Sequence, residues 1–163
     1  MTKIGVISDT HGIFDDKLID FLLPCDELWH AGDIGSFLLL QQLENFKPLK
    51  AVFGNIDDYR VRQCVPEILR FKCEKKDILV THIGGYPGRY EKKISEILKI
   101  NPPDIFICGH SHILKVQYDK KYNMLHINPG AAGKTGFHKY RTAIRFQINN
   151  TELKELEILE IER

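Results

Sequence analysis

The sequence predicts an α/β fold with a parallel sheet, because strands and helices alternate along its first third. Apolar runs that are typical of buried strands are separated by segments with helical spacing of apolar residues. These are the strands Lys3–Ser8, Glu27–His30 and Leu49–Phe53, and the helices Asp15–Leu23 and Ser36–Phe46. Such alternation implies parallel pairing with right-handed crossovers.

The rest of the chain is richer in strands. Two pairs of strands are predicted to form hairpins, Ile68–Glu74 with Asp77–Ile83 and Ile113–Tyr118 with Met124–Ile127. Between them lie a predicted helix, Arg89–Ile100, and a buried strand, Asp104–Cys108. Alternating polarity from Thr142 to Ile148 predicts a half-buried strand. In the terminal segment the apolar phase slips at Ile158 and Leu159, which favours a bulged strand over a helix.

The composition indicates one ordinary globular domain spanning residues 1–163. The formal net charge is +1, from 23 basic and 22 acidic residues, so neither nucleic acid nor a membrane is an expected partner. No targeting segment or membrane-spanning run is visible, and a cytoplasmic protein is expected. The cysteines are expected to be reduced thiols, since none has C-x-x-C spacing: Cys25, Cys64, Cys73 and Cys108.

Polar side chains follow the predicted strands at the points where these end. Five residues have this position: Asp9, Asp33, Asn55, His82 and His110. Because sites in open α/β sheets form at the carboxyl ends of strands, we expect these residues to converge.

Five short blocks contain these residues and further donors: Asp9-Thr10-His11, Gly32-Asp33, Gly54-Asn55-Ile56-Asp57, Thr81-His82 and Gly109-His110-Ser111-His112. Two carboxylates, four imidazoles and an amide exceed what one ion needs, and they suit two divalent ions about 3.5–4 Å apart. Such ligands are compatible with Mn, Fe, Ni, Co or Zn. The three glycines that precede donors, Gly32, Gly54 and Gly109, are expected to allow sharp turns from strand to loop without a side-chain clash.

In these blocks the sequence resembles the calcineurin-like metallophosphoesterase family, whose signature runs D-x-H, G-D, G-N-H-[DE], H and G-H-x-H. All five blocks occur in order between Asp9 and His112, and the small size is similar to the compact bacterial and archaeal phosphodiesterase branch. The resemblance, together with the later strands, implies a four-layer α/β/β/α sandwich with two mixed sheets. It also implies hydrolysis of a small phosphate ester, most often a phosphodiester, and leaves open a homo-oligomer.

The resemblance further implies a ligand set. Asp9, His11 and His112 would hold one metal, and Asn55, His82 and His110 the other. Asp33 would bridge both metals, of which manganese is the favoured identity. A hydroxide shared by the metals would attack phosphorus, with Asp33, Asn55 and His82 as the catalytic residues.

Position 56 departs from the family pattern, because Ile56 stands where the signature has a histidine. That histidine is a candidate proton donor to the leaving group, and Asp57 would normally orient it. Without it, activity should favour esters with acidic leaving groups.

Further contacts with substrate are predicted from three segments. The Asn128-Pro129-Gly130 turn would place Asn128 or a backbone amide such as that of Gly130 beside the phosphate, or is a plain turn. Arg89 follows a glycine-rich segment and would grip a phosphate or lie in solvent. His138 is a candidate replacement proton donor.

The remaining histidines, His30 and His126, are expected to be structural. Two other functions stay open. The first is a catalytically silent interaction scaffold, as the retromer subunit of the family, which has lost part of the ligand set. The second is a nuclease, which the near-neutral charge disfavours.

Overall fold

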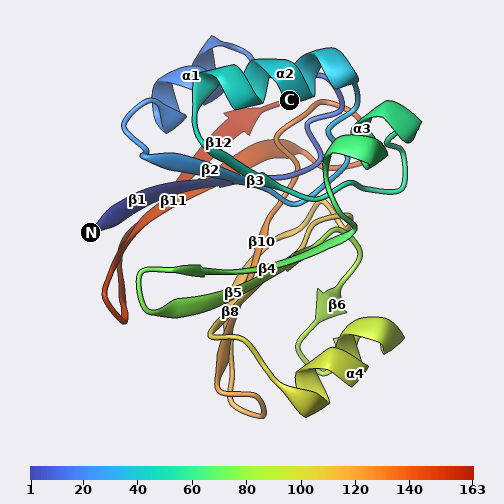
Figure 1. Ribbon diagram of the computed structural model, residues 1–163. Coiled ribbons are helices and arrows are strands. Elements are labelled where there is room, and N and C mark those ends of the chain that lie inside the picture. The colour runs from blue at the N-terminus through green and yellow to red at the C-terminus, as the bar shows by residue number, and fades with distance from the viewer.

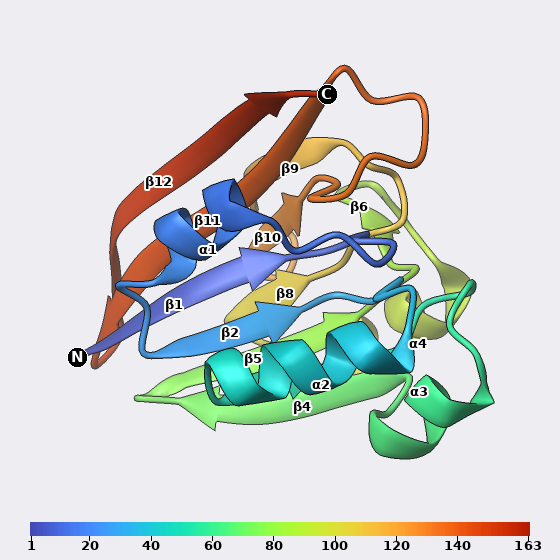
Figure 2. The same ribbon diagram turned by 90° about the horizontal axis from the view of Figure 1, so that it is seen from above.

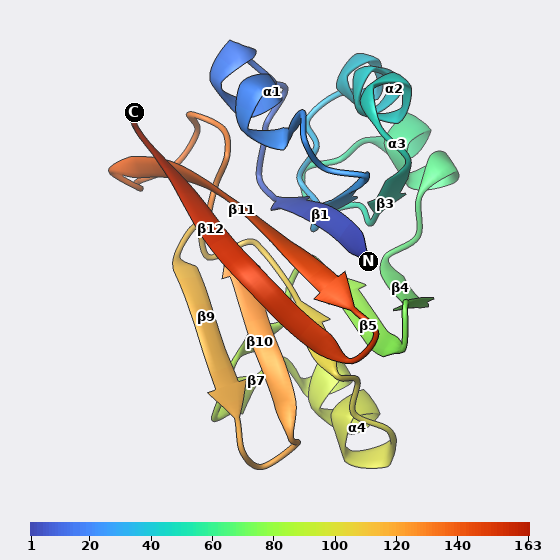
Figure 3. The same ribbon diagram turned by 90° about the vertical axis from the view of Figure 1, so that its left-hand side faces the viewer.

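Two five-stranded sheets pack face to face in the computed structural model, which describes residues 1–163. Helices α1 and α2 cover the outer face of one sheet, and helix α4 lies against the outer face of the other (Figure 1; Figure 3). This arrangement confirms the four-layer α/β/β/α sandwich that the sequence and its resemblance implied.

The first sheet has the strand order β12-β11-β1-β2-β3. Its strands are β1 (Thr2–Ile7), β2 (Glu27–His30), β3 (Leu49–Ala51), β11 (Tyr140–Asn149) and β12 (Glu152–Glu162). Strands β1, β2 and β3 are parallel, whereas β11 and β12 join as antiparallel neighbours. Helices α1 (Asp16–Leu22) and α2 (Phe37–Phe46) are the crossovers (Figure 2). Asp15 and Ser36 cap them by accepting a backbone N–H three residues on.

The second sheet has the order β4-β5-β8-β10-β9. Its strands are β4 (Ile68–Cys73), β5 (Lys76–Thr81), β8 (Ile105–Ile107), β9 (Leu114–Asp119) and β10 (Met124–Pro129). Strands β5, β8 and β10 are parallel, and the two edge strands are antiparallel. The same end of each sheet therefore carries the loops that follow its parallel strands, and both sheets contribute to one site.

Three apolar clusters hold the layers together. The cluster between the sheets includes Trp29, Ile107 and Phe146, all fully buried. A second cluster packs α1 and α2 on the first sheet, and a third packs α4 on the second sheet. Burial of this apolar surface is the main force that fixes the two sheets relative to one another.

The structure differs from the sequence prediction in three places. Helix α4 (Lys92–Ile100) begins three residues later than predicted, because a hairpin of β6 (Gly85–Tyr86) and β7 (Arg89–Tyr90) precedes it. Helix α3 (Tyr59–Cys64) was not predicted. The terminal segment is a bulged strand as expected, although its register shift lies opposite Arg145 and Gln147, at Glu155, rather than at Ile158. None of the helices has the length and apolarity required to cross a membrane.

Candidate metal centre

The loops that follow β1, β2, β5 and β8 bring two groups of metal-ligating side chains together. One group is Asp9, His11 and His112, and the other is Asp33, His82 and His110. Within each group the potential ligand atoms all lie within 4.8 Å of one another. Each group takes residues from both sheets, so the site lies where the sheets meet.

The two carboxylates connect the groups. Oδ2 of Asp33 lies 3.5 Å from Nε2 of His11 and 3.2 Å from Nε2 of His82. Oδ1 of Asp9 lies 3.1 Å from Nε2 of His112 and 3.8 Å from Nε2 of His82. Asp33 therefore contacts histidines of both groups, which is the placement that a bridging ligand requires.

Each carboxylate uses one oxygen for the protein and turns the other toward the histidines. Oδ2 of Asp9 accepts hydrogen bonds from the Ser8 hydroxyl at 2.6 Å and from the His110 backbone N–H at 3.1 Å. Oδ1 of Asp33 accepts from the Ile56 backbone N–H at 3.1 Å. These bonds fix the orientation of both carboxylates without using the oxygens that face the cluster.

Two histidine nitrogens in the cluster lack a hydrogen-bond partner in the protein. Nε2 of His11 and Nε2 of His82 are buried and make no hydrogen bond. Nδ1 of His82 lies 2.7 Å from the carbonyl oxygen of Ala31, which can only accept, so Nδ1 carries the hydrogen and Nε2 has a free lone pair. Metal-binding histidines commonly have this arrangement. The donor set thus fits divalent cations, which would satisfy both nitrogens.

The charges of the cluster match that interpretation. Burial alone would raise the pKa of Asp9, but the imidazoles of His112 and His82 in their protonated forms, together with the hydrogen bond from Ser8, bring that pKa below its usual value. Burial also acts to raise the pKa of Asp33, and the protonated form of His82 outweighs it and lowers that pKa. Both carboxylates therefore stay ionised at neutral pH and keep negative charge in the site.

The backbone of the cluster is unusual. Five donor residues have φ between 45° and 69°, the left-handed region: Asp9, His11, Asp33, His110 and His112. This conformation is uncommon outside glycine, and such residues gather where function requires them. The surrounding sheets and hydrogen bonds hold these backbones in place, so the side chains are oriented before any ion binds.

The glycines that precede donors allow the close approach of other groups. Of the three, Gly32 alone has a positive φ, 97°. A Cβ on Gly54 would lie 2.0 Å from Oδ1 of Asp33, and one on Gly109 would lie 2.0 Å from Oγ of Ser8. The expectation that glycine avoids a side-chain clash at these positions is confirmed, and Gly54 and Gly109 make room for the carboxylate groups.

A model of the calcineurin-like phosphoesterase superfamily domain matches residues 2–151. The chain belongs to the calcineurin-like phosphoesterase superfamily. It is 28% identical over 133 residues to a protein of Methanothermobacter thermautotrophicus named "Probable metallophosphoesterase", covering 78% of this chain and 76% of the relative.

Solved structures share the phosphoesterase fold. Vps29 of Entamoeba histolytica, as a single mutant, superposes with a TM-score of 0.77 at 18% identity, covering 98% of this chain and 99% of that one. An archaeal phosphodiesterase superposes with a TM-score of 0.75 at 21% identity, again covering 98% and 99%. At these identities the likeness concerns the fold.

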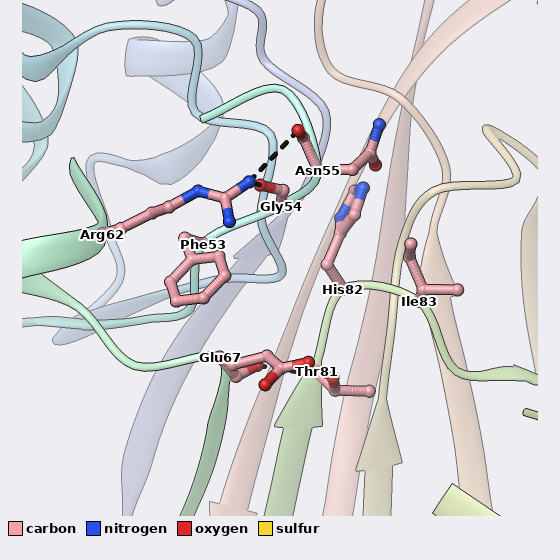
Figure 4. Close-up of a pocket in the computed structure, with 8 residues that line it drawn as sticks. All are labelled: Phe53, Gly54, Asn55, Arg62, Glu67, Thr81, His82 and Ile83. Atoms are coloured by element: carbon pink, nitrogen blue, oxygen red, sulfur yellow. Dashed lines mark hydrogen bonds between the residues drawn. The ribbon is translucent and has the colours of Figure 1, made fainter. Parts of the chain in front are cut away.

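Beside the phosphoesterase cluster, a pocket of about 220 Å³ opens next to His82 (Figure 4). Asn55 and His82 lie at the same end of this pocket, so the predicted ligand Asn55 is near the second group.

Arg62, which also lines this pocket, was missed by the sequence analysis because its helix was missed. Its guanidinium donates to the carbonyl oxygens of Asp57 at 2.6 Å and Asn55 at 3.2 Å. Arg62 thereby supports the loop that carries Asn55.

The carboxylate of Asp57 has a different role from the one the phosphoesterase resemblance implied. It accepts hydrogen bonds from the backbone N–H groups of Ile34, Gly35 and Gly54, at 3.2, 2.9 and 2.8 Å. Asp57 is 4% exposed. It joins the loops after β2 and β3 and is not available to orient a side chain at position 56.

Asn128 and Gly130, which were predicted to contact substrate, make hydrogen bonds within the protein. Nδ2 of Asn128 donates to the Gly109 carbonyl and to the Ser111 hydroxyl, both at 3.0 Å, and Oδ1 accepts from the Gly130 N–H at 3.0 Å. The pair therefore shapes the loop that carries His110.

Arg89 lies in β7 and lines a different pocket, together with Asp119. The structure does not bring Arg89 to the cluster.

His30 supports the site from beneath, as the sequence predicted. Its Nδ1 accepts from the Gly32 N–H at 3.0 Å, and its Nε2 lies 2.9 Å from the Thr10 hydroxyl, which itself donates to the Ile34 carbonyl. Burial lowers the pKa of His30 to about 4, so this ring is neutral. It joins the loops that carry Asp9 and Asp33.

Proposed function

We propose that this protein is a metal-dependent phosphodiesterase that uses two divalent cations. The observation that carries the proposal is the pair of three-residue groups joined by Asp33, with two buried histidine nitrogens left without partners. Bound cations would lower the pKa of water and offset the charge of the phosphate. Ligands of nitrogen and oxygen suit Mn, which we expect to be preferred, and also Fe, Ni, Co or Zn.

The residues of the chain have distinct roles in this proposal. Asp9, His11 and His112 hold one cation, while Asn55, His82 and His110 hold the other, and Asp33 contacts both. The strained but fixed backbone of these residues sets the spacing of the ligands before substrate arrives. The pocket beside His82 receives the phosphate ester, with Asn55 at its edge.

Arg62 adds a positive charge to the same pocket. Its Nε and Nη2 atoms donate to backbone carbonyls, whereas Nη1 makes no hydrogen bond to the protein. A guanidinium held in this way can contact a phosphate oxygen or the departing oxygen at little entropic cost. It would compensate in part for Ile56, which can provide no proton.

A metal-by-substrate panel tests the proposal. Chelator-treated protein would be loaded with each metal in turn and assayed on bis(p-nitrophenyl) phosphate, p-nitrophenyl phosphate and cyclic nucleotides. We expect turnover of the diester in Mn and none in chelator. Absence of turnover in every metal would instead favour the interaction scaffold, for which the shared fold of vacuolar protein sorting proteins provides the comparison.

Duplex DNA belongs in the same panel, since a nuclease is the remaining alternative. The formal net charge of +1 gives no reason to expect duplex binding. We therefore expect no salt-dependent binding of DNA and no cleavage.

A further inference from the structure

A second pocket, of about 230 Å³, borders the loop that carries His110 and His112. Its lining includes Tyr86, Ser111, Ile113, Lys115, His126 and Asn128. It shares no lining residue with the pocket beside His82. The segment after His82 contributes Ile83 to the first pocket and Tyr86 to the second, so this segment lies between them. The metal cluster therefore has two neighbouring pockets. A phosphodiester has two organic groups, so each pocket could receive one of them.

Two side chains give the second pocket an apolar and aromatic surface, Tyr86 and Ile113. Ile113 is 62% exposed and Tyr86 is 44% exposed, although both adjoin a cluster that is otherwise polar. Exposed apolar side chains beside a polar site commonly mark a surface that a ligand covers. Tyr86 offers a ring face or edge to an aromatic group, and Ile113 offers an aliphatic surface.

A positive charge lies at the edge of the same pocket. Nζ of Lys115 is 5.1 Å from the centroid of the Tyr86 ring and forms no ion pair with any carboxylate. No acidic residue lines the pocket. Lys115 in β9 and Ile113, which directly precedes β9, line the same pocket. The charge of Lys115 is therefore available to an acceptor or an anionic group on a ligand.

A buried imidazole forms part of the lining. His126 is 1% exposed, and its Nδ1 has no hydrogen-bond partner. Burial, with a smaller contribution from the charge of Lys115, lowers the pKa of His126 to about 4. An unpartnered polar atom that is buried has a free-energy cost, and natural proteins rarely keep one without a reason. The residues that line the pocket therefore include one with an unpartnered, buried polar atom.

We propose that this second pocket binds an aromatic ester group of the substrate, one whose ring carries a hydrogen-bond acceptor or a negative charge. Tyr86 and Ile113 would pack on the ring, and Lys115 would pair with its substituent. The inference rests on the proposed function, because the phosphate of the same molecule would lie at the metal cluster. The substrate class is thus an aryl or heteroaryl phosphodiester.

Three phosphonates that cannot be hydrolysed provide the test: methylphosphonate, phenylphosphonate and 4-carboxyphenylphosphonate. Their binding to Mn-loaded protein would be measured by calorimetry. We expect wild type to prefer phenyl over methyl, and carboxyphenyl over phenyl. Tyr86→Ala should reduce the phenyl-over-methyl ratio by roughly three- to tenfold, the range expected for loss of an aromatic contact. Lys115→Met should remove the additional preference for the carboxylate.

Tyr118→Ala is the matched control. Tyr118 is an exposed aromatic residue on the same strand β9, 52% exposed, and it lines a pocket with Lys76 and Asp104 instead. Its replacement should leave all three affinities unchanged. The melting temperature of each variant would show that the fold is intact, since Tyr86 and Lys115 are not core residues.

The outcomes separate the pocket from the function. Unchanged ratios in Tyr86→Ala, an equal loss for methyl and phenyl, or no phosphonate binding at all would each overturn the pocket assignment. Turnover of diesters together with unchanged ratios would refute the pocket alone. An intact aromatic preference without turnover in any metal would refute the proposed hydrolysis while supporting the pocket.

Discussion

Nδ1 of His112 lies 3.3 Å from Nδ1 of His138, and Nε2 of His138 lies 2.8 Å from the carbonyl oxygen of Gly133. The carbonyl can only accept, so Nε2 of His138 carries its hydrogen and Nδ1 accepts from His112. Nε2 of His112 is then left with a free lone pair, 3.1 Å from Oδ1 of Asp9. Two acceptors at that distance suit a shared cation. His138 therefore positions His112. This role differs from that of a proton donor, which the sequence had suggested for His138.

Replacing His138 should weaken metal binding more than it affects stability. We expect His138→Ala to lower the affinity for Mn by roughly 10–100-fold, the usual effect of losing a hydrogen bond to a metal ligand. His138→Gln can accept and donate in the same direction and should recover part of the affinity. Calorimetric titration of Mn measures both. The control is Phe137→Ala, because this neighbouring side chain is fully exposed; a similar loss there would argue against the positioning role.

Gly136 allows the two rings to meet. A Cβ at this residue would lie 2.3 Å from Nδ1 of His112 and 3.1 Å from Nδ1 of His138. Gly136→Ala should therefore separate the rings and resemble His138→Ala in metal affinity. An alanine variant that titrates like wild type would show that the contact is dispensable.

Asp33→Asn removes the charge that the two groups share. Because Oδ2 of Asp33 contacts both His11 and His82, we expect the variant to bind fewer than two ions and to lose turnover in every metal, by at least about a hundredfold. Metal analysis of the purified protein and kcat/KM on an aryl diester provide the measurements. Asp58→Asn is the control, since asparagine keeps the cap of α3. Retention of more than a few per cent of activity would refute a shared ligand.

The isoleucine at position 56 predicts a steep dependence on the leaving group. Ile56 is 47% exposed at the site and cannot donate a proton. Rates across aryl and alkyl diesters should therefore fall steeply as the pKa of the leaving alcohol rises. Ile56→His should flatten this plot only slightly, because Asp57 is committed to three backbone N–H groups and cannot orient the new ring. A flat plot in wild type would mean that another group supplies the proton.

The ion pair between Asp15 and Arg141 predicts a pH-dependent contribution to stability. Arg141 donates to Oδ2 of Asp15 at 2.7 Å, and this hydrogen bond holds the pKa of Asp15 below its usual value. A lowered carboxylate pKa stabilises the fold above the unfolded-state pKa, about 3.9, and the benefit is lost as the pH falls through the folded-state pKa.

Asp15→Asn retains the helix cap and removes only the charge. We expect it to lower the free energy of unfolding by about 1 kcal/mol at pH 7, a value kept small because Asp15 is partly exposed. Urea unfolding at neutral pH and below pH 4 would compare the variants, and the difference should shrink in acid. Asp20→Asn on the same helix should show no such change, and a difference that persists in acid would contradict the ion-pair explanation.

The sequence predicted the parallel strands of the first third and the convergence of the donors because both follow from local patterns. Parallel strands place their carboxyl ends together, so the pattern of strand ends alone was enough to group Asp9, Asp33 and His82. The contact between His112 and His138 has no local pattern, since it depends on how a loop folds back. Arg89 was misplaced for a related reason. Gly85 and Gly88 adopt positive φ and form a hairpin where helical spacing had been extended.

Each group of three ligands is divided between the two sheets, and this has a consequence for how the two sheets pack during folding. Neither sheet alone offers a complete group: Asp9 and His11 need His112, and Asp33 needs His82 and His110. A complete group of ligands for an ion would therefore exist only after the two sheets have packed on one another. A bound ion would link the two sheets through its ligands. Removing the metal should therefore weaken the packing between the sheets before it disrupts either sheet.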